Sequence, residues 1–329
     1  MTLLTASSPR TTRRSRQAAS ERSSPSRSPS PPAARSKSPS SKAKKVSSKS
    51  SSSDSDLWED GKGLLTNKYL IMAKYLVLMI ITPPFAIIIT HASKHMEGAC
   101  FDLVMSIIKN PMYLIEIWPS MIDPVAWQLI LGFMAFQLAM MKLVPGSEFK
   151  GTTTPQGNVP VYKANGTACF VIMNVLLVAG AFFTNEIEAV FGVPFRPAIV
   201  YDKFPEIISS LNAFALIFCA LLYVKACTFP SSTDVHFSGD AITNYYWGVE
   251  LYPRILGWDV KMFTNCRCGM MFWAAGTVCF AHKAMEGNGG ALPLGMFVNV
   301  ALQLIYVTKF FHWEMGYMCS MDIQVDRGG

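Results

Sequence analysis

Signatures of several common functional sites are missing from this sequence of 329 residues. It contains no Gly-x-Gly-x-x-Gly, no glycine-rich phosphate loop and no strand pattern, which argues against a Rossmann-type dinucleotide site. Eight cysteines are present, but the spacing Cys266-x-Cys268 has no second cysteine or histidine pair nearby. We therefore expect no metal site, and we expect most cysteines to be reduced and packed among apolar residues.

Charge is also scarce outside the N-terminal segment. Residues 1–56 hold 12 Lys and Arg against three Asp and Glu, whereas the remainder holds 17 against 19. The segment is rich in Ser and Pro and cannot bury enough apolar surface to offset the entropy of ordering. We predict a disordered, basic, cytosolic tail over residues 1–60. A solvated tail that helps to set the topology is the simplest interpretation. The alternatives are an anchor for anionic lipid or nucleic acid and a phosphorylated regulatory arm, of which nucleic acid is the least favoured partner.

Long apolar runs dominate the rest of the chain, whose mean hydropathy is +0.27 overall. About 20 apolar residues are needed to cross the hydrocarbon core of a membrane. We therefore predict an all-α, polytopic transmembrane helix bundle of about six spans in a second domain, residues 61–329. The six runs are 69–90, 125–144, 167–184, 207–224, 269–282 with its flanks, and 292–311. A weaker run at 103–118 carries charged residues and is predicted to be interfacial or re-entrant.

The distribution of basic residues predicts the orientation of this bundle. With the tail in the cytosol, the loops at 142–168 and 225–268 are cytosolic too, and they carry more Lys and Arg than the lumenal loops. Within the first of these loops, Asn165-Gly166 predicts a turn into the third span.

The segment 239–273 places many polar residues between two apolar runs, and its pattern resembles a signature of the sterol reductase family. The matching positions are Gly248, Leu251, Pro253, Arg254, Asp259, Lys261, Arg267 and Gly269. Tyr252 stands where the Δ14-sterol reductases and the lamin B receptor have Asn, so Glu-Leu-Tyr-Pro-Arg is similar to the Δ7-sterol reductase branch. Two further blocks, residues 143–166 with the run PVYKANG and residues 306–327, resemble the same family.

This resemblance covers about residues 64–329 and implies a function. We expect a multi-pass enzyme of the endoplasmic reticulum membrane that reduces the Δ7 double bond of 7-dehydrocholesterol-type sterols with NADPH. A Δ14-sterol reductase and a non-catalytic scaffold like the lamin B receptor are the alternatives. Expected partners are the sterol, membrane lipid and other sterol-pathway membrane enzymes. The family holds its nucleotide in a carboxy-terminal half that this sequence lacks, so we expect a shortened gene model or isoform, or loss of the redox step.

Reduction of an isolated double bond requires a proton as well as a hydride, and a carboxyl group buried in an apolar pocket can keep its proton near neutral pH. The end of the last span is unusually rich in ionisable residues for a membrane boundary. We predict Glu314, Tyr317 and Asp322 as catalytic residues, with Glu314 and Tyr317 on one helix face. The predicted pocket residues are Glu250, Arg254, Asp259, Lys261, Arg267, Lys309 and Asp326. The alternatives are interfacial side chains at the end of the span and a structural ion pair between Glu250 and Arg254.

Overall fold

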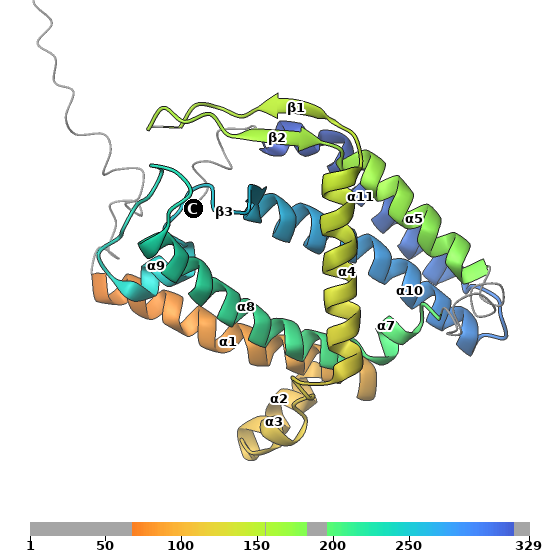
Figure 1. Cartoon of the computed structure of the whole chain (residues 1–329). Coiled ribbons are helices and arrows are strands. Elements are labelled where there is room, and N and C mark those ends of the chain that lie inside the picture. The colour runs from red at the N-terminus through yellow and green to blue at the C-terminus, as the bar shows by residue number, and fades with distance from the viewer. Residues whose placement is uncertain (1–67, 155, 183–195, 319–329) are drawn as a thin grey trace, which may run out of the picture. The chain divides into compact units, whose positions relative to one another are not determined.

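The computed structural model describes residues 68–154, 156–182 and 196–318, which belong to one compact unit of the chain. Most of these residues are helical (Figure 1). Six helices coincide with the six predicted apolar runs: α1 (Lys68–His95), α4 (Pro124–Leu143), α5 (Gly166–Phe182), α8 (Phe204–Thr228), α10 (Met271–Gly287) and α11 (Leu294–Met318). The tail predicted over residues 1–60 lies outside the described residues and stays a prediction.

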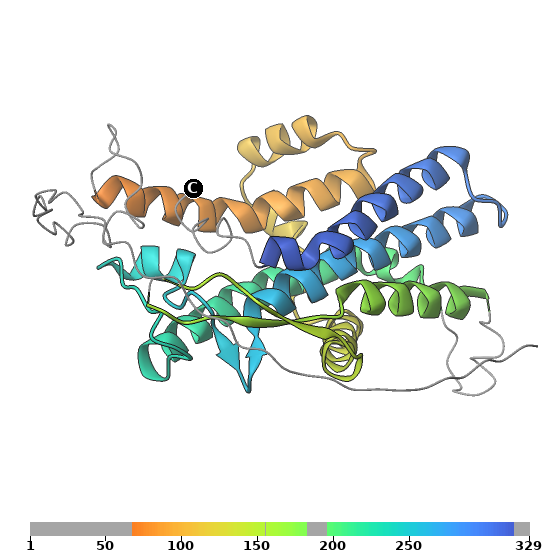
Figure 2. The same ribbon diagram turned by 90° about the horizontal axis from the view of Figure 1, so that it is seen from above.

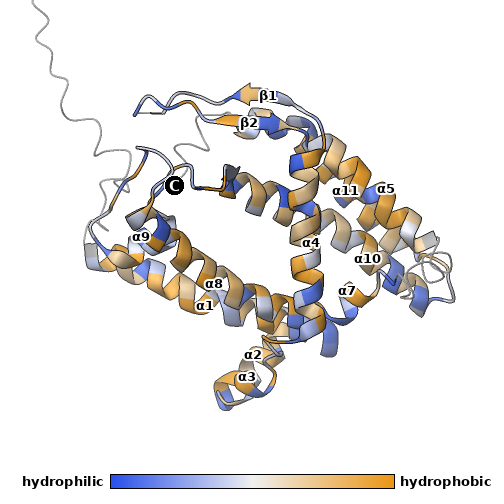
Figure 3. Ribbon diagram, viewed as in Figure 1, coloured by the Kyte–Doolittle hydropathy of each residue, from blue (hydrophilic) through white to orange (hydrophobic). Residues whose placement is uncertain are grey.

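Four of these helices, α1, α4, α8 and α11, are long and apolar enough to cross a membrane, by length and composition. Within the described residues, helices α5 and α10 have 17 residues each, shorter than the roughly 20 residues typical of a span. Large apolar side chains such as Ile80, Ile217 and Ile305 are exposed along the long helices, and hydrophobic residues cover much of their length (Figure 3). Such surfaces suit a lipid environment. Four spans are therefore supported, and the number six stays a proposal.

Shorter helices fill the connections between the long ones. They are α2 (Cys100–Lys109), α3 (Tyr113–Glu116), α7 (Ile199–Asp202), α9 (Ala241–Trp247) and the π-helix η1 (Met262–Met270). The weaker apolar run at 103–118 thus forms two short helices, and α2 packs against α1 (Figure 2). Helix α9 packs against both α1 and α8.

Two short antiparallel hairpins correct the expectation that the chain has no strands. Strand β1 (Ser147–Lys150) pairs with β2 (Val161–Ala164), and β3 (Arg254–Ile255) pairs with β4 (Trp258–Asp259). Strands of four and two residues are too short to produce a readable alternation of apolar and polar residues. Positive φ angles at Leu256 and Gly257, 49° and 81°, close the second hairpin through a tight turn.

The two loops predicted to be cytosolic lie against each other. The Asn158 side chain donates to Asp234 at 2.8 Å, and the Arg254 guanidinium donates to the Val161 carbonyl at 3.1 Å. These contacts agree with the predicted topology, which places both loops on the same side of the membrane. Which side of the membrane they face stays a prediction.

A cluster of buried apolar residues lies where α5, α10 and α11 meet. Its buried residues include Phe170, Met271, Ala274 and Phe311, and the rings of Phe170 and Phe311 stack with their centroids 5.2 Å apart. A second cluster joins β2, the 249–262 loop, η1 and the end of α11; its members are Tyr162, Leu251, Tyr252, Met262, Cys266 and Met318. Segments far apart in the sequence therefore converge around η1.

Candidate functional site

The π-helix η1 is the central element of the site. Asp259, one turn before it, accepts a hydrogen bond from the Met262 N–H at 2.8 Å, and Thr264 Oγ1 donates to the Val260 carbonyl at 2.9 Å. These bonds anchor its first turn. A π-helix is rare and often occurs at functional sites, because its wider turn changes which side chains share a face.

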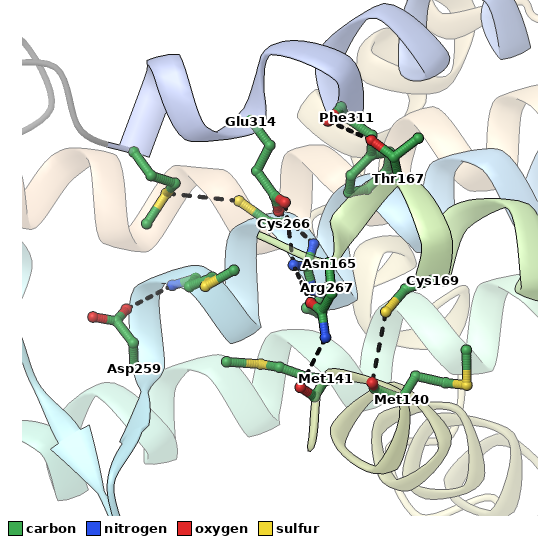
Figure 4. Close-up of polar contacts among 12 residues, drawn as sticks. Met140, Met141, Asn165, Thr167, Cys169, Asp259, Cys266, Arg267, Phe311 and Glu314 are labelled. Atoms are coloured by element: carbon green, nitrogen blue, oxygen red, sulfur yellow. Dashed lines mark hydrogen bonds and ion pairs between the residues drawn. The ribbon is translucent and has the colours of Figure 1, made fainter. Parts of the chain in front are cut away.

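Arg267, on η1, is fully buried and forms an ion pair with Glu314 of α11 (Figure 4). Its Nη1 donates to Glu314 Oε1, and its Nη2 donates to Glu314 Oε2 at 3.2 Å and to Asn165 Oδ1 at 3.1 Å. The planar guanidinium suits such a two-pronged contact with a carboxylate. Glu314 is only 2 % exposed, so both charges are held away from water.

Asn165 and Gly166 connect this ion pair to the start of α5. The Asn165 amide donates to the carbonyls of Met141 and Val144 at 3.1 and 2.9 Å, which ties the pair to the end of α4. A Cβ atom at Gly166 would clash with Glu314 Oε2 and lie 2.7 Å from Arg267 Nη1. Glycine is therefore required here by close approach. We call Asn165, Gly166, Arg267 and Glu314 the buried arginine cluster.

The other predicted residues of α11 have different surroundings. The Tyr317 hydroxyl lies 3.5 Å from the Asn265 side chain of η1, but Tyr317 is 43 % exposed. Glu314 and Tyr317 thus both lie against η1, although only Glu314 is buried. Lys309 is exposed on α11. Asp322 and Asp326 lie outside the described residues.

Glu250 and Arg254 are linked through Ser231. The Ser231 N–H donates to Glu250 Oε1, and the Ser231 hydroxyl and the Arg254 backbone are hydrogen bonded at 2.8 and 3.0 Å. Glu250, itself buried, forms an ion pair with Lys225 of α8 at 2.6 Å. A structural role for this loop was one of the two sequence interpretations, and the contacts with Ser231 and Lys225 add partners that the sequence did not indicate.

Asp259 and Lys261 lie just before η1. Burial raises the pKa of Asp259 above its ordinary value, and its Oδ2 has no hydrogen-bond partner among the described residues. The Lys261 ammonium lies 5.9 Å from the centroid of the Tyr252 ring, within the range of a cation–π contact. Tyr252, the residue that is similar to the Δ7 branch, is 6 % exposed.

A cavity of about 900 Å³ lies among α4, α5, α8, α9, η1 and α10. Its wall is mostly apolar and includes Phe133, Phe214 and Phe272. The polar lining residues are Gln128, Tyr223, Tyr245, Tyr246, Glu250, Lys261 and Thr264. The cavity lining in the described part of the chain does not include any residue of the buried arginine cluster.

The cavity suits an apolar ligand better than a dinucleotide. Lys261 is the one cationic side chain that lines it within the described residues. A pyrophosphate is ordinarily held by several backbone N–H groups or cations. The lining residues therefore do not fit NADPH, and no step that involves the nucleotide is assigned to them.

Sequence reasoning missed the role of the first residues of α5. The PVYKANG run was identified, and a turn into the helix was predicted at Asn165-Gly166; Gly166 does begin α5. Their contacts with Arg267 and Glu314 were not predicted. A glycine beside an asparagine fits an ordinary turn equally well, so nothing local signals a contact of Asn165 with Arg267, 102 positions away.

The three segments that resembled a known family thus meet around η1: β2 with Asn165, the loop with Tyr252, and the end of α11. Residues 60–329 match the ergosterol biosynthesis ERG4/ERG24 family. The chain belongs to this family. It is accordingly a multi-pass membrane protein of the sterol reductases, as the resemblance predicted.

Comparison with individual relatives supports the same conclusion. The chain is 42% identical to 7-dehydrocholesterol reductase of Arabidopsis thaliana over 259 residues, which cover 78% of this chain and 57% of the relative. It is 28% identical to 7-dehydrocholesterol reductase of Xenopus laevis over 277 residues, 79% of this chain and 56% of the relative. It is 25% identical to Delta(14)-sterol reductase of Methylotuvimicrobium alcaliphilum over 265 residues, 80% of this chain and 58% of the relative. The chain spans a little over half the length of these relatives.

Proposed function

We propose that this chain forms the sterol-binding part of an enzyme that reduces the Δ7 double bond of 7-dehydrocholesterol-type sterols in the endoplasmic reticulum membrane. The cavity of about 900 Å³ is the observation that carries the proposal. Ligand sites are commonly cavities of about 300–1,000 Å³ that are mostly apolar with a few polar groups. A sterol, with its rigid apolar rings and single hydroxyl group, has this chemistry.

Two observations support Δ7 over Δ14 specificity. Identity to the A. thaliana 7-dehydrocholesterol reductase is 42%, against 25% for the bacterial Delta(14)-sterol reductase over a similar length. Tyr252, similar to the Δ7 branch, is buried next to the cavity residue Lys261. A Δ14-sterol reductase is the second candidate, because that relative also matches most of this chain.

The reaction adds a hydride to one carbon of the double bond and a proton to the other. NADPH is the hydride donor that the family resemblance implies. Glu314, Tyr317 and Asp322 are the candidates for the proton donor that the sequence indicates, but neither Glu314 nor Tyr317 lines the cavity. Among them, Glu314 has the geometry of a structural carboxylate, because Arg267 binds both of its oxygens.

Binding of radiolabelled 7-dehydrocholesterol to the 329-residue chain in membranes tests the proposal. Gly132 lines the cavity, and nothing lies within 4 Å of a Cβ placed on it, so Gly132→Phe fills space that the ligand would occupy. We expect this variant to lower the affinity at least about ten-fold, equivalent to ~1.4 kcal/mol. Gly295→Phe, on α11 and equally open, is the matched control and should bind like the wild type. Absence of saturable binding to the wild-type chain would refute the proposal.

A further inference from the structure

The buried arginine cluster lies behind one wall of the cavity. Thr264, Cys268 and Gly269 of η1 line the cavity, whereas Arg267 of the same helix points toward α11 and the start of α5. The cluster therefore cannot touch a ligand in the cavity directly. Any influence on the ligand must pass through η1.

The guanidinium of Arg267 connects η1, which forms part of this wall, with neighbouring elements. Arg267 binds Glu314 of α11 and Asn165 before α5, and Asn165 binds two carbonyls at the end of α4. Helices α4 and α5 also contribute lining residues, among them Phe133 and Met173. These buried polar contacts thus connect the elements in addition to the apolar packing among α5, α10 and α11.

The π-helical geometry of η1 makes this placement critical. A π-helix holds about one more residue in each turn than an α-helix does. Relaxation of one π turn to an α turn would rotate the following residues by about one residue step, roughly 100°. Such a rotation would replace the side chains that η1 presents to the cavity. Arg267, near the end of η1, is fixed by Glu314 and Asn165 against this rotation.

We infer that Asn165, Gly166, Arg267 and Glu314 are positioning residues for the sterol, which fix the register of η1 and thereby the shape of the cavity wall. This inference rests on the proposed sterol site. It assigns Glu314 a structural partner in Arg267 and a role that acts through η1. It also gives a function to Gly166, whose missing side chain allows the ion pair to approach the backbone.

Sterol affinity of the 329-residue chain, measured with radiolabelled 7-dehydrocholesterol, tests the inference. Gly166→Ala places a methyl group against the Glu314 carboxylate and should weaken binding at least about ten-fold, or ~1.4 kcal/mol. The measurement is made at a temperature at which the variant stays folded and monodisperse. Gly295→Ala is the control, because a Cβ there meets nothing within 4 Å, and its affinity should match that of the wild type.

The saturation curve separates positioning from a general loss of stability. A loss of stability lowers the number of binding sites and leaves the dissociation constant of the folded protein unchanged, whereas a displaced η1 raises the dissociation constant. We expect Gly166→Ala to raise the dissociation constant at least about ten-fold. If Gly166→Ala does not accumulate as folded protein, Arg267→Lys is measured instead. This variant keeps the positive charge but loses the guanidinium group that reaches both Glu314 and Asn165, so it should also weaken binding.

The outcomes distinguish this inference from the proposal on which it rests. A wild-type chain that binds no sterol contradicts the proposed function and removes the basis of the inference. A wild-type chain that binds sterol, together with a folded Gly166→Ala variant of unchanged affinity, overturns the inference alone. The inference also fails if Gly166→Ala lowers only the number of binding sites and leaves the dissociation constant unchanged.

Discussion

Replacement of Glu314 by Gln tests how the buried arginine cluster is charged. The change keeps the shape of the side chain but removes the negative charge beside Arg267, which is 0 % exposed and cannot lose its own proton. Breaking a buried ion pair by removing one partner costs about 3–5 kcal/mol, because it leaves the other charge uncompensated. Asn165 Oδ1 still accepts one hydrogen bond from Arg267, so we expect the lower end of this range, about 3 kcal/mol.

The assay is the midpoint of thermal unfolding of the detergent-solubilised chain, followed by loss of the monodisperse peak. Glu148→Gln, on the exposed strand β1, is the matched control and should change stability by less than about 0.5 kcal/mol. The pair Arg267→Met with Glu314→Leu removes both charges and should be far more stable than Glu314→Gln alone. A Glu314→Gln variant as stable as the wild type would contradict a charged pair, since it would mean that the carboxyl is neutral in the folded protein and has a proton to donate.

Three other predictions concern the loops and the orientation. Because burial raises the pKa of Asp259, the folded protein binds the proton of this carboxyl more tightly than the unfolded chain does. The stability should therefore fall as the pH rises from about 4 through the folded-state pKa. Asp259→Asn should flatten this dependence in unfolding scans at several pH values. Lys225→Met removes the cation that pairs with the buried Glu250 and should lower the unfolding midpoint more than the exposed change Lys150→Met; equal midpoints would count against a structural role for the pair. A glycosylation site engineered near residue 5 should stay unmodified, because the 12 basic residues of the first segment keep this segment in the cytosol. A site engineered near Lys94 should be modified. The opposite pattern would reverse the topology.

The long helices could be predicted from the sequence because apolar length alone determines them. The run predicted at 125–144 is α4, which begins at Pro124, where Asp123 caps the helix by accepting a hydrogen bond from the Ala126 N–H at 2.8 Å. The two hairpins and the π-helix could not be predicted in this way. The strands are too short for a periodic signal, and the rare π turn has no sequence pattern that separates it from an α turn.

Two residues of the buried arginine cluster were singled out from the sequence, but their pairing was not. Glu314 and Arg267 were each singled out, yet their contact joins residues 47 positions apart and has no local signature. Glu250 was paired with Arg254 because they are neighbours in sequence, whereas Lys225, 25 positions away, is a partner that the fold supplies. Spacing within one helix predicts which side chains lie near each other, but it does not predict which of them is buried. The exposed Tyr317 and the buried Glu314 illustrate this limit.

The most direct test of the account is to map where a sterol binds on the 329-residue chain. A photoreactive analogue of 7-dehydrocholesterol is crosslinked in membranes, with and without an excess of unlabelled 7-dehydrocholesterol, and the labelled residues are identified by mass spectrometry. We expect displaceable labelling of the cavity wall, at or beside Phe133, Phe214 and Phe272. Labelling confined to outward-facing residues such as Ile80 and Ile305, or labelling that the excess sterol does not displace, would contradict it.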